Sequence, residues 1–95
     1  MPDSVHQKAV ITVIGQDKVG IIARVATGLA ALNVNINDIS QTIMQDVFTM
    51  IMLVDIQSMT LDIKDLADKM EALGDDMGLS IRVAHAGIFK AMHRL

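Results

Sequence analysis

The short stretch GQDKVG, residues 15–20, is the part of the chain whose residue types best suit the binding of a small molecule. Aliphatic runs precede and follow it, as expected where a strand passes into a helix. Its two glycines let the backbone approach a ligand closely, and the unpaired amides at the start of a helix favour a carboxylate. Asp17 could orient an ammonium or hydroxyl group. Together these groups suit a zwitterion such as a free amino acid.

A second polar segment, NVNIND, follows the helix that this loop is expected to begin. We expect the loop after the first strand and the beginning of the second strand to lie at the same end of the sheet. Asn35, Asn37 and Asp38 would then border the same cleft as the loop. A structural interpretation is equally open, in which Gly20 allows close helix packing, Asp17 caps the helix and the asparagines are turn residues.

The hydrophobic pattern predicts the strands and helices that position these segments. Alternating apolar residues indicate strands, and apolar residues that recur at intervals of three and four indicate helices. The predicted strands are residues 8–14, 34–44, 47–56 and 79–86, and the predicted helices are residues 19–32, residues 60–77 and a short C-terminal helix at 88–95.

Local signals set the expected ends of these elements. Asp17 and Thr60 are placed to cap the two long helices, and Gly78 is placed to end the second. The alternation of the second strand slips by one residue near Asn37, which predicts a β-bulge. A short turn at residues 45–46 is expected to join the second and third strands as a hairpin.

The order strand, helix, strand, strand, helix, strand predicts an α+β fold, the ferredoxin-like βαββαβ sandwich. Right-handed crossovers give a four-stranded antiparallel sheet with both helices on one face. Because an apolar opposite face needs a cover, we predict a homo-oligomer, with a homodimer favoured. Scattered surface aliphatic residues on a monomer are the alternative. We expect that face to carry the following residues or their neighbours in the sequence: Ile11, Val13, Ile51 and Leu53.

Composition argues against several classes of function. The net charge of -3 and the two aromatic residues, both Phe, leave neither a basic patch nor a stacking platform for nucleic acid. No cysteine is present, and His6, His85 and His93 match no familiar metal-binding spacing. The loop also lacks the arginine of a phosphate-cradling catalytic site. We therefore expect no enzymatic activity, no cofactor and no metal. A metal-binding role for His85 or His93 is the alternative, which tight stoichiometric metal in the purified protein would support.

The N-terminal residues 1–7 are expected to form a flexible tail. They lack the charge and hydropathy order of a signal peptide, and no apolar run in the chain reaches the length of a membrane span. The absence of cysteine fits a reducing compartment. The predicted location is the cytoplasm.

The chain resembles the ACT domain family, and most closely its small stand-alone bacterial and archaeal members. The matching motifs are the GQDKVGI loop, the NINDISQT strand and an AxIFxAM ending, seen here as AGIFKAMHRL. The resemblance covers nearly the whole chain, so residues 8–95 are expected to form a single ACT-like domain. The positions that match the family signature are Gly20, Ile21, Val25, Leu32, Asn35, Ile36 and Ile39.

The resemblance implies a non-catalytic regulatory protein that binds an amino acid or a related metabolite between two subunits. Asp17 would contact the ligand from the first loop, Gly20 would allow close approach, and Asn35 would reach in from the partner. Gly15 stands where some serine-binding relatives have a side chain that holds the ligand, so serine is not implied. The predicted ligand-binding residues are Gly15, Gln16, Asp17, Lys18, Val19, Gly20, Ile21, Asn35, Ile36 and Asn37.

The way in which the protein acts on other molecules has two interpretations. ACT domains are commonly attached to an enzyme or a DNA-binding domain, and this sequence shows neither, so we expect action on a separate client protein or as a free sensor. The alternative is an interaction adaptor that works through homo-oligomerisation without a small-molecule ligand. It would dock its client on the apolar sheet face or on the IFKAMHRL segment.

Overall fold

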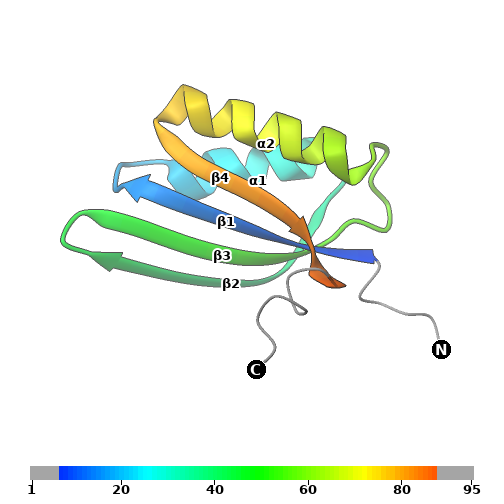
Figure 1. Ribbon diagram of the computed structural model, residues 1–95, viewed down its shortest axis with the longest axis horizontal. Helices are drawn as coiled ribbons and strands as arrows, with labels where there is room; N and C mark the ends of the chain where they lie inside the picture. Colours follow the sequence, from blue (N-terminus) through cyan, green and yellow to red (C-terminus); the bar gives the residue numbers. More distant parts are fainter. Residues whose placement is uncertain (1–6, 88–95) are drawn as a thin grey trace.

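The structure is a computed structural model that describes residues 7–87, and the predicted C-terminal helix at 88–95 lies outside the described residues. The predicted order of four strands and two long helices is confirmed. Figure 1 shows both helices on one face of the sheet. The elements are β1 (Lys8–Gln16), α1 (Ile21–Ala31), β2 (Asn35–Met44), β3 (Val47–Asp55), α2 (Ile63–Met77) and β4 (Leu79–His85).

The sheet has the strand order β2-β3-β1-β4, and every neighbouring pair is antiparallel. The strands β1 and β3 are central, and β2 and β4 are the two edges. Because β1 and β2 are both antiparallel to β3, they run parallel to each other, and α1 returns the chain between them. This strand direction decides which segments can meet at a site.

The hydrophobic core lies between the sheet and the two helices. Ile11 and Val13 are fully buried in it, so on β1 their sequence neighbours, and not these two residues, line the opposite sheet face. The central strand β1 is apolar on both faces, and alternation alone did not show which set faces the helices. Ile51 lies on the open face as expected and is 43% exposed, together with Ile14 at 48%.

Both helices begin at other residues than predicted. Gly20, and not Asp17, is the N-cap of α1, and no side chain caps this helix. Asp62, and not Thr60, is the N-cap of α2, because its carboxylate accepts a hydrogen bond of 2.9 Å from the amide of Asp65. The predicted end of α2 at Gly78 is confirmed by its left-handed conformation.

The predicted hairpin between β2 and β3 is confirmed. Gln45 and Asp46 form its turn with φ values of 50° and 71°, as in the two-residue turns that match the twist of paired strands. The pairing register shifts between Ile36 and Asp38, so the predicted β-bulge is also present. In the part of the chain that the structure describes, no helix is long and apolar enough to cross a membrane.

Candidate functional site

A cleft of ≈ 340 Å³ opens where β1 ends and α1 begins. One wall comes from the loop and the first turn of α1, and the other comes from β2 and β3. The residues that line it are Asp17, Lys18, Gly20, Ile21, Ile22, Ala23, Gln41, Ile43 and Phe48. The cleft therefore contains four of the ten predicted ligand-binding residues.

Gly20 marks the start of α1 at this cleft. Its φ of 89° lies in the left-handed region, and a Cβ built on it would meet no atom within 4 Å. Backbone conformation, rather than close helix packing, therefore explains this glycine. The first-turn amides of a helix have no partner within the helix, and here no side chain caps them. The cleft thus receives the positive end of the α1 dipole, which favours an anion.

The loop before Gly20 is held at both sides. The amide of Asp17 donates a hydrogen bond of 2.8 Å to the carbonyl of Asp46 in the β2–β3 turn. The Nζ of Lys18 donates one of 2.6 Å to the carbonyl of Met77, at the end of α2. These bonds hold the loop in place, so Asp17 lines the cleft beside the first-turn amides of α1.

Gly15 and Gln16 belong to β1 and not to the loop. Gly15 pairs with Leu79 on β4, and a Cβ on Gly15 would lie 2.5 Å from Leu79 Cδ2 and 3.3 Å from Leu79 Cα. The close packing of the two strands therefore accounts for this glycine. Val19, at the tip of the loop, is fully exposed and does not line the cleft.

The structure places Asn35 at the other end of the sheet from the loop. Asn35 pairs with Asp55 at one end of β3. At the other end of β3, Val47 pairs both with Met44 of β2 and with Gln16 of β1. The ten residues of β2 span about 30 Å at roughly 3.3 Å per residue. The expectation that loop and strand start share one end is therefore wrong, because β1 and β2 run parallel.

The other two predicted residues of β2 share this remote position. Ile36 is half-buried and packs against the core. The Oδ1 of Asn37 accepts a hydrogen bond of 2.7 Å from Nζ of Lys8, at the start of β1. Within one chain, neither reaches the cleft.

Five residues that line the cleft were not predicted from the sequence: Ile22, Ala23, Phe48, Gln41 and Ile43. The last two, Gln41 and Ile43, lie on β2. Beyond the bulge, they pair with Met50 and Phe48 and share the helix-facing side of the sheet with them. The signal was the topology itself, since the loop after β1 must lie beside the end of a parallel β2. Ile43 gives the cleft an apolar wall together with Ile22 and Phe48, and Gln41 adds a polar amide group.

Metal ligation finds no support among residues 7–87, where no three acidic or histidine side chains are placed to hold an ion. His85 is half-buried on β4, and its Nδ1 accepts a hydrogen bond of 3.4 Å from the amide of Gly87. His6 and His93 lie outside the described residues.

Comparison with known proteins agrees with the fold and the resemblance. The family model described as ACT domain matches residues 7–84. A UPF0237 protein of Methanococcus maripaludis is 52% identical over 89 residues, which cover 94% of this chain and 99% of the relative. A UPF0237 protein of Bifidobacterium longum is 51% identical over 88 residues, which cover 93% and 98%.

Among solved structures, an ACT domain protein from Streptococcus pneumoniae superimposes with a TM-score of 0.78 and 42% sequence identity. The match covers 90% of this chain and 97% of that one. The chain therefore belongs to the ACT domain family, within the stand-alone UPF0237 proteins of bacteria and archaea.

Proposed function

We propose that this protein is a cytoplasmic, non-catalytic regulator that binds an amino acid or a related small metabolite in the cleft at the start of α1. One observation carries the proposal: the cleft is lined both by the N-terminus of α1, which no side chain caps, and by the acidic residue Asp17. Membership of the ACT family supports a regulatory role for such a site.

The chemistry of the cleft matches the three parts of an amino acid. Its carboxylate would accept hydrogen bonds from the first-turn amides of α1, where the helix dipole favours negative charge. Its ammonium group would pair with Asp17. Its side chain would lie against Ile22, Ile43 and Phe48, and Gln41 would supply or accept a hydrogen bond. A volume of ≈ 340 Å³ is at the small end for ligand sites, which favours a small metabolite.

A homodimer that pairs through β2 would complete the site. This strand is an edge of the sheet, and it exposes Ile39 by 40%, Ile43 by 52% and Met44 by 68%. A long edge strand that exposes apolar side chains invites pairing with another chain. If two copies of β2 pair antiparallel about a two-fold axis, Asn35 of the partner subunit comes to the Met44 end, beside the loop. The proposed role of Asn35 then needs the partner.

Calorimetry of the purified protein against the common amino acids tests the proposal. We expect one of them to bind, and Asp17→Asn to weaken its binding because the ammonium partner is lost. Asp65→Asn, which removes one charge from the exposed surface of α2, is the matched control. Flat titrations with all amino acids, from a protein shown to be folded and dimeric, would refute the binding of an amino acid.

The second candidate function is an adaptor that binds a client protein without a small molecule. The open face of the sheet favours it, because Ile14, Val47 and Ile51 are each exposed by more than two-fifths there, at 48%, 48% and 43%. Asn35→Ala separates the two functions. If the protein is a ligand-binding dimer, the variant should lose affinity for its amino acid and keep its mass in solution. If the protein is an adaptor, neither property should change.

A further inference from the structure

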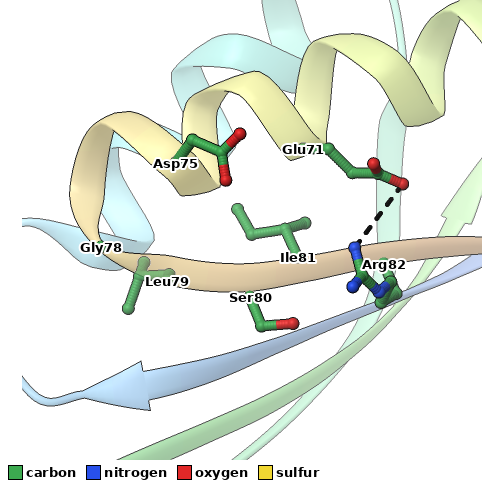
Figure 2. Close-up of a pocket in the computed structure, with 7 residues that line it drawn as sticks. All are labelled: Glu71, Asp75, Gly78, Leu79, Ser80, Ile81 and Arg82. Carbon is green, nitrogen blue, oxygen red and sulfur yellow. Dashed lines mark ion pairs between the residues drawn. The ribbon is translucent and has the colours of Figure 1, made fainter.

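A depression of ≈ 300 Å³ lies between α2 and β4, apart from the cleft at α1. Figure 2 shows two carboxylates of α2 above the strand and the guanidinium of Arg82 below one of them. Successive residues of β4 line it, so side chains on both faces of the sheet contribute, and no residue of β1 does. The depression therefore follows the outer edge of β4. Its lining residues are Glu71, Asp75, Gly78, Leu79, Ser80, Ile81 and Arg82.

The outer edge of β4 has no partner strand among residues 7–87, because β4 pairs only with β1. An edge strand presents a row of backbone N–H and C=O groups that can pair with another chain. At seven residues, β4 is long enough to accept an added strand. The backbone of this edge therefore supplies main-chain hydrogen-bonding positions, as in peptide recognition by strand addition.

The side chains above this edge select for positive charge. Glu71 and Asp75 are four residues apart on α2, so their carboxylates project from the same side of the helix. Figure 2 shows both on the side that faces the depression. Asp75 has no ion-pair partner in the described part of the chain, so the edge carries unpaired negative charge.

Arg82 occupies the position that an incoming cation would take. It is paired on the sheet with Thr12, yet its guanidinium reaches past the edge to Glu71, at 3.8 Å. The side chains of Arg82 and Glu71 are 70% and 44% exposed. An exposed pair at this distance contributes little and is easily displaced. A charged side chain across an edge is also the usual protection against uncontrolled pairing.

We propose that the outer edge of β4 is a docking site for an extended, basic segment of another protein. The segment adds as a strand beside β4, and one of its Lys or Arg side chains lies between Glu71 and Asp75 after displacing Arg82. This inference does not depend on the ligand at α1, because the two sites share no lining residue.

The probe is a fluorescent seven-residue peptide of alternating lysine and valine, with a glutamate and valine peptide as its matched control. Fluorescence anisotropy should show binding of the lysine peptide alone. Glu71→Gln/Asp75→Asn should weaken it roughly tenfold, because two charge pairs are lost. Asp65→Asn/Asp76→Asn removes the same charge from the same helix, outside the depression, and should leave the affinity unchanged. Arg82→Gln should strengthen binding, because the internal competitor is gone.

Amide hydrogen exchange locates the peptide. We expect outward-facing amides of β4, among Ser80, Ile81 and Arg82, to exchange more slowly in its presence. Equal binding of both peptides, no binding at all, or protection elsewhere would overturn the proposal. Dimerisation of the Arg82→Gln variant through β4, seen by light scattering with protection at the same amides, would also overturn it, because the occupant would then be a second copy.

Discussion

The Nζ of Lys18 lies 2.6 Å from the carbonyl oxygen of Met77, so the loop that begins α1 is hydrogen-bonded to the last turn of α2. A lysine at this position satisfies a carbonyl that the helix leaves unpaired, and it interacts favourably with the negative end of the helix dipole. The loop beside the candidate cleft and the end of α2 beside β4 are thereby joined by one side chain.

Replacing Lys18 by Met should lower the free energy of unfolding by about 1 kcal/mol, since the charged donor of a partly buried hydrogen bond is lost. Urea denaturation measures this change. Lys64→Met is the control: Lys64 is 81% exposed and pairs with Asp68 at 3.4 Å, so its loss should change stability by less than about 0.5 kcal/mol. Equal effects of the two substitutions would contradict the structural role of Lys18.

Replacing Gly15 by Ala should destabilise the protein by about 1–3 kcal/mol, because the new methyl group would overlap Leu79 on β4. Gly20→Ala should cost about 1 kcal/mol for a different reason, the strain of a left-handed residue with open space around it. To separate the two causes, thermal unfolding is measured for each glycine variant with and without the additional substitution Leu79→Val. The smaller neighbour should relieve part of the Gly15→Ala effect and none of the Gly20→Ala effect.

The two glycines also show what sequence could and could not establish about the site. The spacing of residues 15–20 correctly predicted that a strand passes into a helix here, and Asp17 and Gly20 do line the cleft. It could not show that β1 continues through Gly15, because a glycine ends a strand pattern in sequence whether or not the neighbouring strand requires the space.

The larger error concerned strand direction. Each element was predicted from its own local pattern, and the hairpin, the bulge and the order of elements were correct for that reason. Which segments meet depends on the direction of β2 relative to β1, and this is a property of the whole sheet. Because this direction was not predicted, Gln41 and Ile43 were missed, and Asn35 was expected beside the loop of its own chain.

Helix α2 provides a test of capping. Asp62→Ala should lower stability by about 1 kcal/mol, because the amide of Asp65 loses the carboxylate that accepts its hydrogen bond. Thr60→Ala should change stability by less than about 0.5 kcal/mol, since Thr60 is exposed and precedes the cap. Chemical denaturation of the two variants decides between the observed cap and the one expected from sequence. A larger loss for Thr60→Ala would contradict the structure.

The proposed pairing of two β2 strands can be tested by cross-linking introduced cysteines, because the protein has no native cysteine. Antiparallel pairing of the full ten-residue strands about a two-fold axis brings residue 35 of one subunit beside residue 44 of the other. Mixed Asn35→Cys and Met44→Cys proteins should therefore form a cross-linked heterodimer with a short bismaleimide, in greater yield than either variant alone. Ile51→Cys, on the open sheet face, is the contrasting variant. Efficient cross-linking of Ile51→Cys to itself, with none in the mixture, would assign the dimer to the sheet face and remove Asn35 from the binding site.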